Sequence, residues 1–376
     1  MDSTAAGQSR CLDAFTIAVQ QACEGFGWYA STKQLQLASF QYCVACRNET
    51  TLHLVVDDCI PRRLLAAAAA EGSRDQPLAL AERGLTRAAK RGSRRVPRFN
   101  ARKVTWSCKS SRKLATPMNI LSDAEDFLLE RGLEGDLGAV AWPPRLKRFA
   151  FGDLFDEEVD GIAWPSSLEV IDFGFHFNQP IEAVKWPAQL LEVRLSEGFD
   201  HEIEQVAWPP TIECLSFGYD FDRSIERVAW PVSLRQLVFG HRFNHPIERV
   251  SWPASLRWLK FGKRFNQPVG AVTWPAELQQ LEFGDAFSQK IDEVLWPLSL
   301  QQLSLGRWFN EPLCGVGKCM PGLLELTLRM RWQTYSFSIG TVEWPPMLQK
   351  LTIDKRLWDH NWQCFPKGLE LDVFLH

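Results

Sequence analysis

Residues 230–251 read WPVSLRQLVFGHRFNHPIERVS, and residues 252–273 repeat the pattern as WPASLRWLKFGKRFNQPVGAVT. Each stretch opens with Trp-Pro, continues through an apolar segment that ends in Phe-Gly, and carries Phe-Asn near its middle. Trp-Pro recurs at residues 142, 164, 186, 208, 230, 252, 274 and 296, so the period is 22 residues without insertion. A fixed period of this length indicates a repeat architecture.

A small set of positions keeps its residue type in nearly every copy, when the Trp is counted as position 1. Position 5 is Leu or Ile, position 8 is apolar, position 10 is Phe or Leu, and position 14 is always Phe. Position 11 is Gly except at Ser196, and position 15 is Asn or Asp except at Ser288. Apolar residues that alternate at positions 8 and 10 predict a short strand with one buried face, which Gly ends. Each copy therefore predicts one flattened coil.

One such coil cannot fold alone, because its few apolar side chains do not offset the entropy lost in ordering its backbone. Stacked coils bury each other's faces and place neighbouring strands ~4.8 Å apart in a parallel sheet. Like residues then form ladders, Trp on Trp, Phe on Phe and Asn on Asn. The period therefore predicts a mainly β solenoid.

The segments FNQPI (177–181), FNHPI (243–247), FNQPV (265–269) and FNEPL (309–313) follow Leu-x-x-Leu-x-Phe-Gly or a close variant. They resemble the FNIP repeat, which is akin to leucine-rich repeats (LRRs), and the resemblance covers roughly residues 120–317. It implies an LRR-like stack of coils that is used for protein contacts, sometimes joined to an F-box or kinase domain. This chain departs from the family in placing Trp where Leu or Ile usually precedes Pro. The resemblance brings no catalytic residue.

We expect four parts along the chain. They are a small helical N-terminal region (1–80), a basic linker with the start of the solenoid (81–119), the repeat solenoid (120–317) and degenerate C-terminal capping repeats (318–376). Residues 120–141 look helical at first, but Phe127 and Leu129 fall on positions 8 and 10, which favours a degenerate first coil. KVTWS (103–107) echoes AVTWP (271–275), so the solenoid is expected to begin near residue 100.

Composition favours a soluble folded protein, with 45% hydrophobic and 23% charged residues. The longest apolar run, LLAAAAA at 64–70, is far shorter than the ~20 residues of a membrane span. No basic region precedes the apolar N-terminal segment, so we expect no secretory signal and no membrane contact. The sequence predicts a cytoplasmic protein, with the nucleus as an alternative if the basic segment is a nuclear address.

The N-terminal third leaves three alternatives open. Cys43, Cys46, His53 and Cys59 have spacings that suit a small zinc knuckle, although we favour small buried cysteines on a helix and expect no cofactor. Residues 83–113 hold twelve Lys or Arg and no Asp or Glu in a chain of formal charge −3. Such a segment can bind nucleic acid, but a solvated linker is the favoured interpretation. Residues 1–80 carry no clear F-box signature, and an F-box-like or other adaptor unit stays open.

No set of residues predicts catalysis. His241 and His245 lie in one copy, but their spacing falls across a corner and no carboxylate motif accompanies them. The chain has no Walker loop and no His-Glu-x-x-His motif. We therefore expect a protein that is not an enzyme.

Positions 7 and 9 flank the buried strand residue, vary from copy to copy and should point outward. Trp258 is an aromatic residue on this face, where a binding hot spot often lies, although it could instead cover its neighbours' methylene groups. The candidate partner-binding residues are Trp258, Lys260, Arg194, Asp172, Val238 and Gln236 on the strands, and Arg242, Lys263, Arg264, Tyr219, Phe175 and Trp308 at positions 12 and 13. The cations around Trp258 predict a basic surface and an acidic partner.

Two hypotheses for function follow from these features. The first is a protein–protein interaction scaffold that uses the variable outward face of the repeat sheet. The alternative is a nucleic-acid-associated protein that grips phosphate through residues 83–113, a contact that would weaken steeply with salt.

Overall fold

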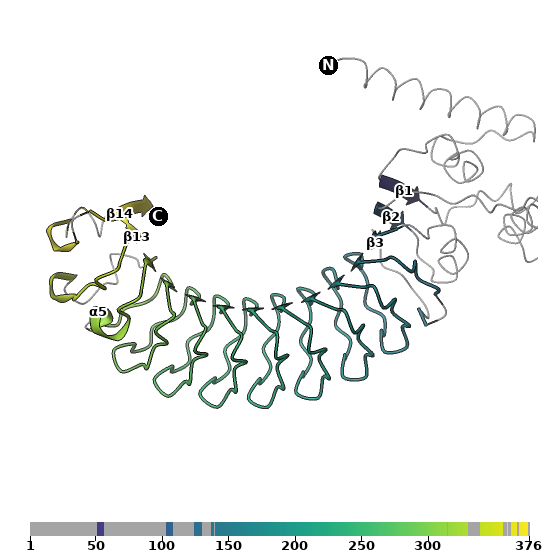
Figure 1. The fold of residues 1–376 in the computed structure, drawn as a ribbon, viewed down its shortest axis with the longest axis horizontal. Helices are drawn as coiled ribbons and strands as arrows, with labels where there is room; N and C mark the ends of the chain where they lie inside the picture. The colour runs from purple at the N-terminus through teal and green to yellow at the C-terminus, as the bar shows by residue number, and fades with distance from the viewer. Residues whose placement is uncertain are drawn as a thin grey trace, which may run out of the picture. The chain divides into compact units, whose positions relative to one another are not determined.

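The computed structural model describes residues 51–55, 103–107, 124–129, 137–138, 140–313, 315–329, 339–355, 359, 362–366 and 368–374. The chain divides into two compact units, residues 1–155 with 162–168, and residues 156–161 with 169–376. Within each unit, short strands pair in parallel with the next strand along the chain (Figure 1). The predicted parallel β solenoid is confirmed.

The first unit contains four described strands, each paired with the next. They are β1 (Thr51–Val55), β2 (Lys103–Ser107), β3 (Asp126–Leu129) and β4 (Arg148–Ala150). In β3, Phe127 and Leu129 are buried, and Phe127 stacks on Phe149 with ring centroids 5.8 Å apart. Residues 126–129 thus form a strand of the sheet, as a degenerate first coil requires, and are not helical.

Two expectations for the N-terminal part change. Residues 51–55 form strand β1 within a region expected to be mainly helical, because Thr-Leu-His-Leu-Val alternates apolar residues and is rich in β-formers. Val104 pairs with Phe127, so KVTWS forms the sheet strand itself. Its similarity to AVTWP would place Trp106 at position 1 of a coil. The observed pairing instead aligns Val104 with Phe127, which is at position 8.

Most of the remaining N-terminal predictions fall outside the described residues. This holds for the rest of the expected helical region 1–80, for Cys43, Cys46 and Cys59, and for the basic segment 83–113 apart from β2. These predictions stay untested.

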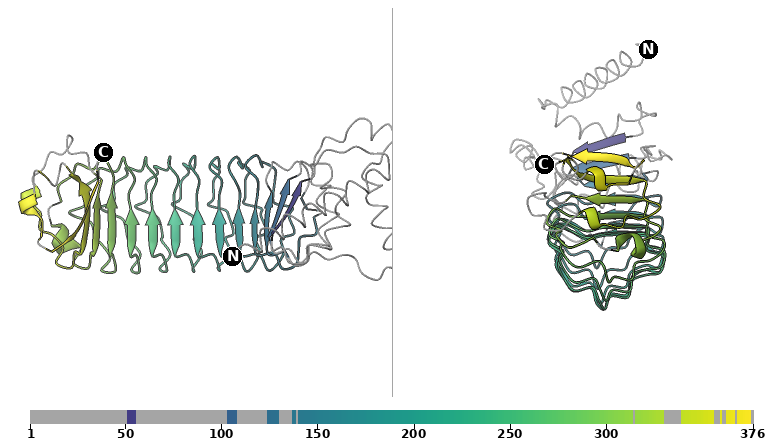
Figure 2. Two further views of the ribbon diagram at one scale, coloured as in Figure 1. Left: turned by 90° about the horizontal axis from the view of Figure 1, so that it is seen from above. Right: turned by 90° about the vertical axis from the view of Figure 1, so that its left-hand side faces the viewer.

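The second unit continues the same pattern over a longer stretch, and Figure 2 shows its central strands side by side and pointing the same way. Its strands are β5 (Val170–Asp172), β6 (Glu192–Arg194), β7 (Cys214–Ser216), β8 (Gln236–Val238), β9 (Trp258–Lys260), β10 (Gln280–Glu282), β11 (Gln302–Leu305), β12 (Glu325–Leu328), β13 (Lys350–Asp354) and β14 (Glu370–Phe374). Its short helices are α5 (Val316–Cys319), η6 (Ile339–Thr341) and η7 (Trp362–Cys364).

The strands from β5 to β11 keep the 22-residue interval, and the C-terminal strands do not. Gln302 pairs with Glu325 and Glu325 pairs with Lys350, which are intervals of 23 and 25 residues. The added residues lie outside the strands, so the sheet continues although the coils vary. Strand β14, in the segment where an edge strand was predicted, pairs with β13.

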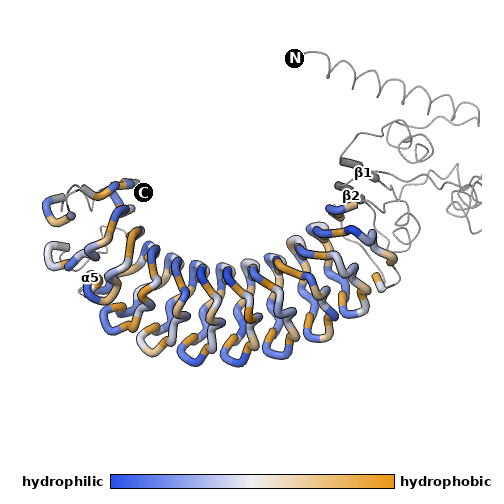
Figure 3. Tube along the Cα trace, viewed as in Figure 1, coloured by the Kyte–Doolittle hydropathy of each residue, from blue (hydrophilic) through white to orange (hydrophobic). Residues whose placement is uncertain are grey.

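Aromatic rings fill the core of the second unit in register. The Phe residues at position 14, from Phe177 to Phe309, are fully buried and stack with centroids 6.0–6.3 Å apart. Those at position 10, from Phe217 to Phe283, stack at 5.5–5.7 Å. Figure 3 shows apolar and polar residues alternating around each coil. The predicted Phe ladder is confirmed.

The Trp rings stack in pairs, Trp186 with Trp208, Trp230 with Trp252 and Trp274 with Trp296. Trp296 donates its indole N–H to the carbonyl oxygen of Ile291. Among the described residues, no acceptor meets the buried indole N–H groups of Trp186, Trp208, Trp230, Trp252 and Trp274. An unpartnered buried donor costs about 1–3 kcal/mol. The large apolar area of each ring must offset that cost.

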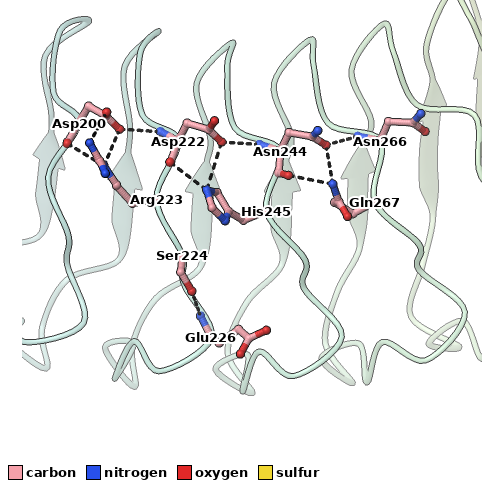
Figure 4. Close-up of polar contacts among 9 residues, drawn as sticks. All are labelled: Asp200, Asp222, Arg223, Ser224, Glu226, Asn244, His245, Asn266 and Gln267. Carbon is pink, nitrogen blue, oxygen red and sulfur yellow. Dashed lines mark hydrogen bonds and ion pairs between the residues drawn. The ribbon is translucent and has the colours of Figure 1, made fainter.

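A polar ladder joins the coils at position 15 (Figure 4). The side-chain oxygen of each residue accepts the backbone N–H of position 15 in the next coil, at 2.7–3.1 Å from Asp156 to Asn310. Position 16 adds a second contact, because its side-chain nitrogen reaches back to position 15 of the preceding coil. Gln267 Nε2, for example, donates to the carbonyl oxygen of Asn244 at 2.9 Å. The predicted Asn ladder is therefore present and doubled.

Gly at position 11 is required because neighbouring coils approach closely there. A Cβ atom on Gly240 would lie 1.5 Å from the carbonyl oxygen of Gly218. The exception, Ser196, follows a coil in which Gly174 has a φ of 70°, the one position-11 glycine in the described residues with positive φ. The Ser side chain at position 11 thus occurs next to a coil whose own position 11, Gly174, has a different backbone conformation.

We expect Gly240→Ala to destabilise the second unit by about 2–4 kcal/mol, because the added methyl group forces two backbones apart. The matched control is Gly270→Ala, where a Cβ atom would meet nothing within 4 Å. That variant should stay within about 1 kcal/mol of the wild type. Urea unfolding followed by circular dichroism measures both, and equal stability of the two variants would contradict the close approach.

Asn244→Ala should cost about 1–3 kcal/mol, because it removes the acceptor of the Asn266 backbone N–H. Asn244→Asp retains that acceptor, as Asp222 does at the same position one coil earlier. We expect the Asp variant to lose less than about half as much stability. The ladder would be unimportant if both variants unfolded at the wild-type denaturant concentration.

Candidate functional site

The sheet of the second unit presents one outward face. In each strand from β5 to β10 the central residue is buried, and the two flanking residues are half-exposed or exposed. This confirms that positions 7 and 9 point away from the core. The face therefore brings together the strand candidates Asp172, Arg194, Gln236, Val238, Trp258 and Lys260.

Trp258 is half-exposed and bound to its neighbours. Its indole N–H donates to Glu282 Oε1 at 3.2 Å, and Glu282 Oε2 lies 2.9 Å from Lys260 Nζ. One carboxylate thus holds both Trp258 and Lys260 across the boundary between β9 and β10. The Trp ring keeps part of its surface open, whereas the ammonium group of Lys260 forms an ion pair with Glu282.

Other cations on this face or at its edge also have carboxylate partners. Arg242 lies 3.1 Å from Asp220, and Arg194 lies 2.6 Å from Glu192. Within the part of the chain that the structure describes, Lys263 and Arg264 have no carboxylate within ion-pair distance. Among the cations of the predicted basic surface, Arg242 and Lys260 are therefore paired, and Lys263 and Arg264 at the strand ends are not.

Positions 12 and 13 of successive coils form a row, here called the corner row, where the chain turns away from the sheet. The backbone N–H at position 13 donates to the carbonyl oxygen at position 12 of the preceding coil, as from Arg264 to His241 at 3.0 Å. These bonds fix the turn. Three aromatic side chains on the row stay about half exposed, Phe175 at 51%, Tyr219 at 45% and Trp308 at 49%.

Tyr219 and His241 stack on the corner row, with centroids 4.3 Å apart and planes 15° apart. The Nδ1 atom of His241 is buried, and none of the described residues provides a hydrogen-bond partner for it. Burial lowers the pKa of His241 below its ordinary value, and the positive charges of Lys263 and Arg264 lower it further. The ring is therefore neutral at pH 7.

Sequence reasoning missed the contacts made by residues at positions 16 and 4. Arg223 at position 16 binds Asp200, with its Nη2 atom 2.7 Å from Oδ2, and His245 Nε2 lies 2.9 Å from the carbonyl oxygen of Asp222. Ser255 and Ser299 at position 4 donate to main-chain carbonyl oxygens of the preceding coil. A nitrogen-bearing side chain at position 16 from residue 179 to residue 289 was the available signal.

Within the described ranges, no group of His, Cys, Asp and Glu is placed to hold a metal ion. None of the described helices is long and apolar enough to cross a membrane.

Replacing Lys263 and Arg264 together by Ala should raise the pKa of His241, because two positive charges that oppose its protonation are removed. The ring stays buried, so the pKa should remain below that of a free imidazole. Titration of the His241 ring protons by nuclear magnetic resonance measures the shift. An unchanged or lowered pKa would show that these cations do not act on the ring.

The comparisons with known proteins agree with this geometry. Residues 221–264 match the FNIP Repeat family. The structure is similar to that of CroV588, described as a novel circular LRR protein, with 25% identity over 73% of this chain and 42% of that chain, and a TM-score of 0.53. The chain therefore spans less than half of CroV588.

A second solved structure is an internalin, inlF, from Listeria monocytogenes, with 10% identity over 68% of this chain and 75% of that chain, and a TM-score of 0.49. No curated protein sequence matches the chain. Residues 221–264 are thus similar to FNIP repeats, and the solenoid is similar in fold to the LRR protein CroV588.

Proposed function

We propose that the chain is a protein-interaction scaffold whose second unit offers the outward sheet face and the corner row to a partner protein. Solenoids present extended surfaces of this kind. The proposal is supported by the difference between framework positions and accessible positions within each coil. Framework positions are buried and nearly uniform, whereas positions 7, 9, 12 and 13 are accessible and differ from coil to coil.

The observation that carries the proposal is the set of half-exposed aromatic side chains on a fixed backbone. Phe175, Tyr219 and Trp308 stay accessible although the core next to them is closely packed with rings. Aromatic residues are enriched among the side chains that contribute most to binding. Because the backbone of the row is already hydrogen bonded, little entropy is lost there on association.

The finer predictions remain proposals. They are the non-enzymatic character, the cytoplasmic location and the specific partner-binding role of each candidate residue. The nucleic-acid alternative depends on residues 83–113, of which the structure describes β2 alone.

Affinity capture with the immobilised full chain tests the proposal. We expect Tyr219→Ala/Trp258→Ala to reduce the amount of captured protein about tenfold or more, because these rings lie on the corner row and on the sheet face that we propose contact the partner. The matched control, Val232→Ala/Leu298→Ala, removes side chains that are 74% and 83% exposed at position 3, away from the sheet face. This control variant should capture as much protein as the wild type does.

Two outcomes would count against the scaffold. One is equal capture by the face variant and the wild type. The other is capture that disappears on nuclease treatment and on neutralising the Lys and Arg residues of 83–102, which would favour the nucleic-acid alternative.

A further inference from the structure

We propose that the corner row between Tyr219 and Arg264 binds an extended acidic segment of the partner, which runs from coil to coil along the solenoid. The residues concerned, Tyr219, His241, Lys263 and Arg264, are here called the 219–264 corner. This inference rests on the proposed function and names the class of partner.

The charge of the partner follows from which side chains remain unpaired. Asp220 lies 3.1 Å from Arg242, Glu282 lies 2.9 Å from Lys260, and Asp285 lies 4.0 Å from Arg307. These three acidic groups thus already have cations, and a fourth, Glu197 beside Tyr219, accepts the backbone N–H of Tyr219 at 2.8 Å. Lys263 and Arg264 are both exposed, are neighbours on one turn and have no carboxylate within ion-pair distance among the described residues. Carboxylates supplied by a partner would complement them, and Arg can bind a carboxylate through two parallel hydrogen bonds.

The apolar part of the corner lies beside these cations. Tyr219 and His241 stack nearly parallel and offer a flat ring surface, of which Tyr219 is 45% exposed. Since the His241 ring is neutral at pH 7, an apolar side chain can cover the stack without burying a charge. The corner therefore combines a platform for an apolar side chain with a site for acidic ones.

The spacing of the coils sets the spacing of the partner's residues. Adjacent coils lie ~4.8 Å apart, so the coil of Tyr219 and the coil of Lys263 are separated by roughly 10 Å. An extended chain advances about 3.3 Å per residue. The bound segment should therefore place its acidic residues about three positions from an apolar or aromatic residue.

Selection of short random peptides displayed on phage against the immobilised full-length chain tests this inference. We expect enriched peptides to carry Asp or Glu residues about three positions from an apolar or aromatic residue. A fluorescent copy of the most enriched peptide is then titrated with variant chains, and its anisotropy gives the affinity.

The corner variant Lys263→Glu/Arg264→Glu should weaken binding of that peptide about tenfold or more, because it replaces two attractive contacts by repulsive ones. The control is Arg249→Glu/Lys290→Glu, which makes the same change of charge at two exposed residues away from the corner. It should bind as the wild type does. Added salt should weaken wild-type binding as well.

Enrichment of basic or uncharged peptides, absence of enrichment, or equal loss in the corner variant and the control would overturn the inference. These results are distinguishable from failure of the scaffold proposal. If protein capture still depends on Tyr219 and Trp258 while acidic peptides fail to bind, the scaffold proposal is supported and the acidic segment is rejected. If protein capture is also independent of those two rings, both proposals are rejected.

Discussion

The whole structure depends on contact between each coil and the next at an identical register. A Phe ring at position 14 meets the same ring 22 residues later, and the Asn or Asp at position 15 accepts the N–H of its counterpart. Neither contact can form within a single coil. The ring stacking and the hydrogen bonds at position 15 therefore require the same offset from one coil to the next. At this offset the backbones of most coils come so close at position 11 that only Gly fits, as Gly240 does against the carbonyl oxygen of Gly218.

The uniform interior leaves the exterior free to vary. Because Leu237 and Leu259 hold the strands from within, Gln236 and Val238 can differ from Trp258 and Lys260 without cost to the fold. Charges placed on this face pair across coil boundaries, as Lys260 does with Glu282. The unpaired charges of Lys263 and Arg264 are thus a local property of one coil, and they distinguish that coil from its neighbours.

The repeat itself could be predicted from the sequence, because period, alternation and Gly placement all express the same geometry. The outward direction of Trp258 followed from strand alternation, and it is confirmed. The pairing of Trp258 and Lys260 with Glu282 could not be foreseen, because it depends on side-chain positions that change from coil to coil. The echo Val-Thr-Trp indicated that the sheet extends to about residue 100, but it could not give the register of β2, in which Val104 pairs with Phe127.

Hydrogen exchange resolved at single amides tests the central claim most directly. If coils stabilise each other, the backbone N–H groups of Asn244 and Asn266, which lie on exposed residues but are bound to the preceding coil, should be protected about as strongly as strand amides. Exchange of these amides at the rate of an unstructured chain, while the strand amides of β8 and β9 stay protected, would contradict mutual stabilisation through the ladder.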